Sequence, residues 1–423
     1  MNEKFLYFIW QSGLFKKENI KALTGEKIDI IRTGTRNDES GPDFFNALIK
    51  INGISLAGNV EIHVKSSDWI QHKHSNDPAY KNVILHVVYE HDCPVEDSDG
   101  NTIPVVLLDF SKKLFTRYHE LIENPHPIHC HGKTDKAEPF RIKTFLTSLT
   151  VEKLHQKAMI IADMLKTNKN NWEETFYQLL ARNFGFHVNS VPFEMLARSL
   201  PLRILSKHKN SLLQTEALLY GQSGLIGKSE QPSEYEKQLL TEYQFLQNKY
   251  SLTPLKDGIW KFSPVRPHNF PTIRISQMAA ILTRTFPLFA AVINARSTKE
   301  IEEFFNHSAS DFWDDHYSFV ASSKNYQKNF GKVSFNNLVM NTVAPFLFLY
   351  GHIKDEDSFT TRSVELLESI PPEQNSIITT WKKSGMKAMD ASESQALLYL
   401  YKNFCQPHRC IECTIGSMIV IQN

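Results

Sequence analysis

The sequence has no marked excess of charge of either sign. Its 423 residues contain 47 Lys and Arg against 46 Asp and Glu, which gives a formal net charge of +1. Proteins that bind nucleic acid through their overall field usually have a strongly basic domain. The balance of charges therefore excludes that class, and any contact with nucleic acid requires a local basic patch.

Long hydrophobic runs and paired cysteines are also absent. No stretch approaches the roughly 18 uninterrupted apolar residues that a transmembrane helix needs. Near the N-terminus an apolar run is broken by Gln11 and Ser12, and no small-residue cleavage site follows, unlike a secretory signal. The five cysteines are an odd number, which indicates a reducing compartment rather than a disulfide framework. We expect a cytoplasmic protein without a membrane partner.

The length and the pattern of the chain indicate two domains. With 41% hydrophobic and 22% charged residues, the composition is that of a globular protein with a sizeable core. The pattern changes near residues 110–140, where Glu123–Lys133 contains two prolines and a glycine and no periodicity. We therefore predict an N-terminal domain over residues 1–125 and a second domain over residues 126–423.

Residues 126–423 are predicted to form a mainly α-helical domain with a cysteine-rich tail. Apolar residues recur there at the spacing of one helix face. No repeat of fixed length joins the segments, so a regular solenoid is not expected. Helices are predicted over residues 142–165, 172–184, 193–205, 212–220, 235–250, 276–289, 300–305, 336–350, 363–369 and 392–404.

The N-terminal domain is predicted to be an α/β structure built around one hairpin. Asn52-Gly53 is a strong signal for a tight turn. It joins a strand over Asp43–Ile51 to a return strand over Ile54–Val64, in which Gly58-Asn59 is typical of a bulge. Around this hairpin the pattern predicts a helix near Lys4–Trp10, a short helix beginning at Pro78, a buried strand over Val83–Tyr89 and a strand over Val105–Leu108.

The return strand places several chemically active side chains on one face. Alternate residues of a strand share a face, so Glu61, His63 and Lys65 lie together, and counting back from the turn brings Asp43 close to them. Carboxylate oxygens are the ligands that Mg²⁺ and Mn²⁺ prefer. Asp43 and Glu61 are therefore the predicted ligands of such an ion, which activates water for phosphoryl chemistry.

A second chemistry uses the histidines that lie on and after this strand. Imidazole suits zinc, and His63, His72 and His74, with Asp77, form the alternative ligand set. Convergence of these imidazoles favours the zinc site, whereas shared reach of the two carboxylates favours the Mg²⁺ or Mn²⁺ site. His86 interrupts an otherwise apolar strand and is predicted to be a hydrogen-bonded core histidine.

The order of elements in the first domain resembles the core of the PD-(D/E)xK nuclease superfamily. Pro42-Asp43 matches the aspartate that opens the second strand, and Glu61 matches the acidic residue of the third. Two positions after Glu61 stands His63 rather than the superfamily's lysine, and a lysine follows only at Lys65. The resemblance implies a restriction-endonuclease-like fold (helix, three strands, helix, strand) in which His63 or Lys65 orients the attacking water.

Several specific stretches are spread over the whole chain. They are Gly41-Pro42-Asp43-Phe44, Gly58-Asn59-Val60-Glu61-Ile62-His63, Ser67-Asp68-Trp69 with His72 and His74, Val83-Ile84-Leu85-His86-Val87-Val88, Arg266-Pro267-His268-Asn269-Phe270-Pro271, and Cys405, Cys410 and Cys413. In these stretches the chain resembles a bacterial family catalogued as domain of unknown function 2851, and the resemblance covers nearly all of the sequence. It brings no established function.

Three cysteines near the C-terminus have the spacing of a metal site. Cys405, Cys410 and Cys413 include the Cys-x2-Cys pattern that a tetrahedral thiolate site needs. Cys130 is the preferred fourth ligand, and His408 is the local alternative. A zinc ion, an iron–sulfur cluster and ordinary buried thiols all fit this pattern.

Two further segments are candidates for contacts with a substrate. Arg266, His268 and Arg274 lie around two prolines and carry donors that suit phosphate or carboxylate. The alternative is that they brace neighbouring helices. Trp69 is predicted to anchor its loop in the core, with stacking on a nucleobase as the alternative.

The sequence and its resemblance together predict a metal-dependent nuclease that hydrolyses phosphodiester bonds and has nucleic acid as its partner. One alternative is a non-catalytic nucleic-acid-binding or assembly module on the same fold. The other is a zinc hydrolase that uses the histidines. Geometry decides between them, because each chemistry needs a different set of side chains in one place.

Overall fold

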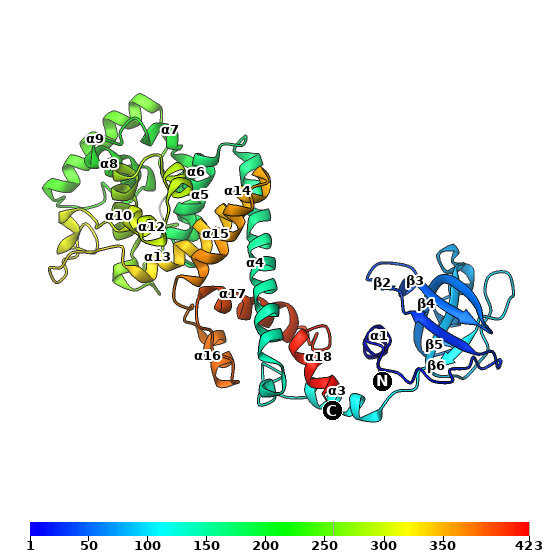
Figure 1. Ribbon diagram of the computed structural model, residues 1–423. Helices are drawn as coiled ribbons and strands as arrows, with labels where there is room; N and C mark the ends of the chain where they lie inside the picture. The colour runs from blue at the N-terminus through cyan, green and yellow to red at the C-terminus, as the bar shows by residue number, and fades with distance from the viewer. Residues whose placement is uncertain (257, 423) are drawn as a thin grey trace. The chain divides into compact units, whose positions relative to one another are not determined.

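The computed structural model describes residues 1–256 and 258–422, which form two compact units (Figure 1). Unit 1 contains Met1–Lys143 and Lys383–Met386, together with the C-terminal residues from Leu400 onward. Unit 2 contains Thr144–Lys382 and Lys387–Tyr399. The C-terminal tail therefore belongs to the same unit as the N-terminal sheet.

Unit 1 has a six-stranded mixed sheet with the order β1-β3-β4-β5-β6, and β2 pairs with β3 at one end. The first part is antiparallel, because β3 pairs with both β1 and β4 in that sense. β5 is parallel to β4 and to β6. The strands are β1 (Ile28–Arg32), β2 (Thr35–Arg36), β3 (Phe44–Ile51), β4 (Ile54–Lys65), β5 (Val83–Glu90) and β6 (Val105–Leu107).

The hairpin between β3 and β4 confirms the prediction from Asn52-Gly53. Both turn residues have positive φ, 49° at Asn52 and 89° at Gly53, as a type I′ turn requires. Pairing runs from Ile51 opposite Ile54 to Phe44 opposite Val60, with a register shift between Phe44 and Ala47. This bulge ends the regular ladder where Asp43 meets the middle of β4.

Helix α1 (Glu3–Gln11) confirms the helix predicted near Lys4–Trp10, and it packs against β4. Its first turn is capped by Asn2, whose side chain accepts the N–H of Phe5 at 2.9 Å. Phe5, Leu6, Ile9 and Trp10 are fully buried, so one face of this short helix is inserted into the core of unit 1.

Short helical segments fill the connection between β4 and β5. They are α2 (Asp68–Gln71), the 3₁₀ turn His74–Asn76 and a second 3₁₀ turn, Pro78–Tyr80. Asp77 caps the last of these by accepting the N–H of Ala79 at 2.9 Å. Trp69 is 1% exposed, and its Nε1–H donates to Ser75 Oγ at 2.9 Å, so the packing role predicted for this residue is confirmed.

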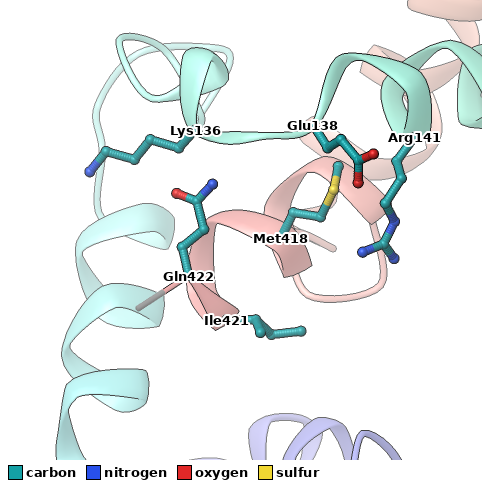
Figure 2. A pocket seen from close by; sticks show the side chains of 6 residues that line it. All are labelled: Lys136, Glu138, Arg141, Met418, Ile421 and Gln422. Atoms are coloured by element: carbon teal, nitrogen blue, oxygen red, sulfur yellow. The ribbon is translucent and has the colours of Figure 1, made fainter.

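The rest of unit 1 includes two helices that pack together. Helix α3 (Lys112–Ile122) packs against the C-terminal helix α18 (Thr414–Ile421). A pocket of about 220 Å³ lies beside α18. Figure 2 shows its lining, in which Met418, Ile421 and Gln422 of the C-terminal segment face Lys136, Glu138 and Arg141 from the chain leading into and beginning α4.

Unit 2 is mainly α-helical, in agreement with the sequence pattern, and encloses one large apolar core. None of its described residues belongs to a strand of the sheet. The helices, counting the one that begins in unit 1, are α4 (Pro139–Thr167), α5 (Trp172–Phe184), α6 (Ser190–Ser199), α7 (Leu202–Leu205), α8 (Leu212–Ser223), α9 (Glu234–Tyr250), α10 (Pro271–Arg284), α11 (Leu288–Asn294), α12 (Thr298–Phe305), α13 (Lys332–Leu338), α14 (Ala344–Lys354), α15 (Asp357–Glu368), α16 (Ser376–Lys383) and α17 (Ala391–Leu400).

Prolines break three of the predicted helices. Pro201 separates α6 from α7 and Pro287 separates α10 from α11, because the residue before a proline avoids the helical conformation. Pro345 has no N–H to donate to Asn341 four residues earlier. A π-helical turn, Val339–Val343, forms there instead, and Asn183 Nδ2 donates to the free Asn341 carbonyl at 3.0 Å.

Across residues 1–256 and 258–422, no single helix is long and apolar enough to cross a membrane. The helices α10 and α11, which are bent by 67° at the break between them, have the length and the apolar composition of a membrane span when they are counted as one segment.

Candidate metal centre

Three histidines of unit 1 converge on one point. The ligand nitrogens of His63, His72 and His74 all lie within 4.8 Å of one another. His72 Nδ1 is 3.2 Å from His63 Nε2, and the rings of His63 and His74 are stacked with centroids 5.3 Å apart. His63 and His74 are buried, whereas His72 is exposed at the rim. The cluster is therefore open to solvent on one side.

Local structure explains how three residues from a short stretch meet. His63 points from β4, and His72 is the C-cap residue of α2. Lys73 then adopts a left-handed conformation with φ 62°, which turns the chain so that His74, at the start of the next 3₁₀ turn, faces the same point. The loop is held at its base because Asp68 Oδ2 accepts the N–H of Lys65 at 2.9 Å.

Glu61 adds a carboxylate to the three imidazoles. Its Oε1 lies 3.4 Å from His63 Nε2 and 3.2 Å from His74 Nε2. Within the described residues, His74 Nε2 nevertheless has no partner with hydrogen-bond geometry. Glu61 is only 4% exposed. A buried carboxylate beside a buried ring nitrogen without a hydrogen bond is an arrangement that a metal ion would satisfy.

Asp43 stands directly before β3, and two hydrogen bonds connect it to β4. Its N–H donates to Glu61 Oε2 at 3.0 Å, and its Oδ2 accepts the N–H of Ile62 at 2.9 Å. The Arg36 guanidinium lies 4.0 Å from Asp43 Oδ1 and 3.7 Å from the centre of the Tyr7 ring. Asp43 therefore joins Glu61 to a cation at the edge of the site.

Burial dominates the electrostatics of the centre. It raises the pKa of Asp43 to about 7, with a further increase from the charge of Glu61, and it raises the pKa of Glu61 to about 8. It lowers the pKa of His63 to about 2 and that of His86 to about 3. The imidazoles of His63 and His86 are therefore neutral at physiological pH, which is the protonation state that binds metals.

His86 supports the cluster from the neighbouring strand. It is fully buried in β5, and its Nε2 lies 2.9 Å from His63 Nδ1. The prediction of a hydrogen-bonded core histidine is confirmed. When His63 donates through Nδ1, the lone pair of its Nε2 points toward His72 and Glu61. Metal-binding histidines are commonly oriented in this way by a bond from the other ring nitrogen.

The other predicted site residues near β4 lie apart from this cluster. Lys65 is at the exposed end of the strand, and its Nζ is 3.6 Å from Glu90 Oε1. Asp77 caps a 3₁₀ turn. The residues that the structure brings together are therefore Glu61 with His63, His72 and His74, next to Asp43.

The remaining candidates occupy other places. Arg266 and His268 are exposed in unit 2. Arg274 is 2% exposed and donates to Gln277 Oε1 at 2.9 Å and to Ser334 Oγ at 2.8 Å, as the bracing alternative predicts. The four cysteines Cys130, Cys405, Cys410 and Cys413 are free and buried in unit 1.

Two residues at the site were not predicted from the sequence. Tyr7 lies on α1, and its phenol is close enough to Asp43 to influence the pKa of that carboxyl. Arg36 belongs to the two-residue strand β2. Neither carries a local signal, because a tyrosine on an amphipathic helix and an arginine in a short strand are both common.

The comparison with protein families decides the classification. The family described as "Protein of unknown function (DUF2851)" matches residues 3–376. The chain belongs to this family. The range matched by the DUF2851 family includes the histidine cluster and Cys130, and it ends before the three C-terminal cysteines. No curated protein and no solved structure matches the chain.

Proposed function

We propose that this protein is a divalent-metal-dependent hydrolase that cleaves phosphodiester bonds in nucleic acid. The observation that carries the proposal is the convergence of three imidazoles and one buried carboxylate on a single point of unit 1. Glu61, His63 and His74 would form the buried part of the ligand set, and His72 would complete it at the solvent side.

The donor set favours a transition metal over magnesium. Imidazole nitrogen suits zinc and iron, and the Glu61 carboxylate adds an oxygen ligand that manganese also uses, whereas Mg²⁺ prefers an all-oxygen environment that keeps several waters. The expected ligands are therefore the histidines together with Glu61, rather than the carboxylate pair of Asp43 and Glu61. Bound here, the ion would lower the pKa of a coordinated water and neutralise charge on a phosphoryl group.

The protein's own side chains would divide the remaining work. The Asp43 N–H holds Glu61 Oε2 in place, so Asp43 acts as a positioning residue for that ligand. His86 orients His63 through the Nδ1 contact. Arg36, stacked on Tyr7 near Asp43, offers a cation for one phosphate oxygen. His72, at the rim, lies where substrate would enter.

The substrate class is supported by the order of elements around the site. One helix, an antiparallel set formed by β1, β3 and β4, short helices and then the parallel strand β5 follow one another. Asp43 precedes β3, and Glu61 lies on β4, which are the places of the acidic residues in the nuclease superfamily that the sequence resembles. His63 stands where that superfamily has its lysine.

The proposal is tested with the full chain and defined nucleic acids. Single-stranded and double-stranded DNA and RNA are incubated with metal-free protein to which Zn²⁺, Mn²⁺ or Mg²⁺ has been added. We expect cleavage with Zn²⁺ or Mn²⁺, and we expect Glu61→Gln to reduce its rate on the order of 100-fold or more. Glu90→Gln is the matched control, because this exposed glutamate on β5 pairs with Lys65.

The other outcomes identify the alternatives. Metal-independent binding of nucleic acid without cleavage would replace the enzyme with a non-catalytic module. Hydrolysis of carboxylic esters or peptides, but not of phosphodiesters, would retain the metal centre and change its substrate class. Equal cleavage rates in the Glu61→Gln and wild-type proteins would refute the assignment of Glu61.

A further inference from the structure

Unit 1 contains a second group of metal-binding side chains, distinct from the histidines. Four of the five cysteines are free and between 7% and 8% exposed. A single buried cysteine behaves as a small apolar residue and needs no explanation. Four buried cysteines that come from two distant parts of the chain do need an explanation. We refer to them as the cysteine cluster, which consists of Cys130, Cys405, Cys410 and Cys413.

Two segments pack together to form this cluster. The segment 122–131 follows α3, and the segment 400–413 leads into α18. The rings of His129 and His408, which flank the cysteines in sequence, have centroids 4.3 Å apart. Residues 122–127 and 129 from the first segment and 401, 405, 406 and 408 from the second line one pocket of about 460 Å³. Cys405 is at the wall of this pocket, which provides a route for an ion.

The backbone near Cys405 departs from a regular α-helix. α17 continues into a π-helical turn, Tyr401–Cys405, in which Gln406 N–H donates to the Tyr401 carbonyl at 2.9 Å. Such turns insert one residue into a helix and often occur at functional sites. The insertion changes the direction of Cys405 relative to an uninterrupted helix.

The four thiols share a buried environment. Burial raises the pKa of Cys130 and Cys410 to about 12 and that of Cys413 to about 11, and it also raises the pKa of Cys405. Charge repulsion adds to this effect, and it links every pair among the four thiols. Four buried thiols on two segments that pack together, without a disulfide, are an arrangement that one shared cation would stabilise.

Cys413 stands at the N-terminus of a helix. It is the N-cap residue of α18, and its side chain makes no capping hydrogen bond. The positive end of the helix dipole would stabilise a thiolate that binds a cation there. The chain also approaches closely here, because a Cβ on Gly416 would lie 2.0 Å from the Cys410 carbonyl oxygen.

We infer that the cysteine cluster is a four-thiolate site for a thiophilic metal, either one zinc ion or an iron–sulfur cluster. A structural zinc ion and an iron–sulfur cluster can each be held by four cysteine ligands. The site would fasten the C-terminal segment to the end of α3, because metal binding of this kind contributes directly to folding. It is separate from the histidine cluster and does not depend on the proposed hydrolase activity.

The spacing of the sulfurs favours the iron–sulfur cluster. Four thiolates around one zinc ion lie about 3.8 Å apart, given Zn–S bonds of about 2.3 Å in a tetrahedron. Among the residues that the structure describes, the group of ligand atoms within 4.8 Å consists of the three histidines, not of the cysteines. A cluster accommodates wider spacing because different irons carry the thiolates.

The experiment uses the full chain, purified without oxygen and without chelators after expression with added iron and zinc. Metal content, visible absorption and electron paramagnetic resonance after reduction are measured. An iron–sulfur cluster gives iron with acid-labile sulfide and visible absorption, whereas zinc gives about one colourless equivalent. For a zinc site, replacement by Co²⁺ gives a thiolate-to-metal charge-transfer band, which the histidine cluster alone does not produce.

Variants separate this site from the histidine cluster. Cys413→Ser and Cys130→Ser should lose the iron, or one equivalent of zinc, and the thiolate spectrum. Cys93→Ser is the matched control, because the fifth cysteine lies between β5 and β6 and does not belong to the cluster. His74→Ala should leave the thiolate spectrum unchanged.

Two results would overturn the inference. One is wild-type protein that contains neither iron nor thiolate-bound zinc and gives no charge-transfer band with Co²⁺. The other is a spectrum that persists unchanged in both cysteine variants. Thiol counting provides a measurement on the wild-type chain alone, since the four thiols should become reactive together when a chelator removes the metal.

Discussion

Asp43 and Glu61 hold each other in place through the backbone. The N–H of Asp43 donates to Glu61 Oε2 at 3.0 Å, and Asp43 Oδ2 accepts the N–H of Ile62, the residue after Glu61, at 2.9 Å. Each carboxylate therefore bonds to the backbone of the segment that carries the other. This exchange lies beyond Phe44 opposite Val60, the last pair of the ladder between β3 and β4. It leaves Glu61 Oε1 directed toward the imidazoles.

The first prediction concerns His86, which orients His63. Replacing it in a His86→Asn variant shortens the side chain and removes the bond to His63 Nδ1. We expect the affinity for Zn²⁺ or Mn²⁺ to fall about 10- to 100-fold, the usual effect of losing such a supporting bond. Competition with a fluorescent chelator measures this affinity in the full chain.

His91→Asn serves as the control for His86, because His91 is exposed and contacts Ser66 Oγ at 3.1 Å. It should retain wild-type metal affinity. A His86→Asn protein that binds the metal as tightly as the wild type would show that His63 needs no support from β5.

The second prediction concerns Lys157, whose ammonium is enclosed by Met340, Asn341 and Gln395 at 2.9 to 3.1 Å. Burial lowers its pKa to about 7. Between this value and its unfolded pKa of about 10.4, the unfolded chain holds a proton that the folded chain has lost. The free energy of unfolding should therefore rise with pH across this window.

Lys157→Met should remove this contribution. From pH 7 to pH 9.5 the wild type should gain about 1–3 kcal/mol of stability over the variant, measured as the difference in denaturant unfolding of unit 2. Lys166→Met on the same helix is the control, since Lys166 is exposed beside Asp163. Parallel pH profiles of the wild type and the Lys157 variant would contradict the prediction.

The third prediction concerns Gly416 in the C-terminal helix. A methyl group there would lie 2.0 Å from the Cys410 carbonyl oxygen, a backbone atom that cannot move aside cheaply. Gly416→Ala should therefore detach α18 and make the tail sensitive to protease, at a cost of roughly 3 kcal/mol or more. Limited proteolysis with mass spectrometry locates the cleavage.

Ser417→Ala tests the neighbouring position without adding volume. It removes only a bond from Ser417 Oγ to the Thr414 carbonyl and should leave the tail resistant. If Gly416→Ala is equally resistant, α18 can shift away from Cys410 without loss of packing.

The fourth prediction concerns the hairpin that sets the register of β3 and β4. Gly53 has φ 89°, which an L-residue adopts at a cost of about 1–2 kcal/mol. Gly53→Ala should accelerate hydrogen exchange of the amides in both strands, whereas Asn52→Gly should not, because glycine accepts the φ of 49° found there. Equal exchange in the two variants would show that pairing with β1 and β5 sets the register.

Features that depend on near neighbours in the chain were predictable from the sequence. Asn52-Gly53 specified the turn because few residue pairs accept two positive φ angles, and the alternation of residues 60–65 placed Glu61 and His63 on one face. The limits of α5 followed from the periodicity of its apolar residues. Prolines set the helix breaks, although the spacing of apolar residues alone predicted continuous helices there.

The tertiary structure decided which side chains meet. His72 and His74 reach His63 only because Lys73 turns the chain and Trp69 anchors the loop, and periodicity does not describe such a loop. Arg36 and Tyr7 come to Asp43 from other elements, and the segment with the C-terminal cysteines meets the segment of Cys130, where the His129 and His408 rings lie 4.3 Å apart. These contacts depend on how segments that are distant along the chain pack together. The local conformational preferences of the residues do not determine this packing.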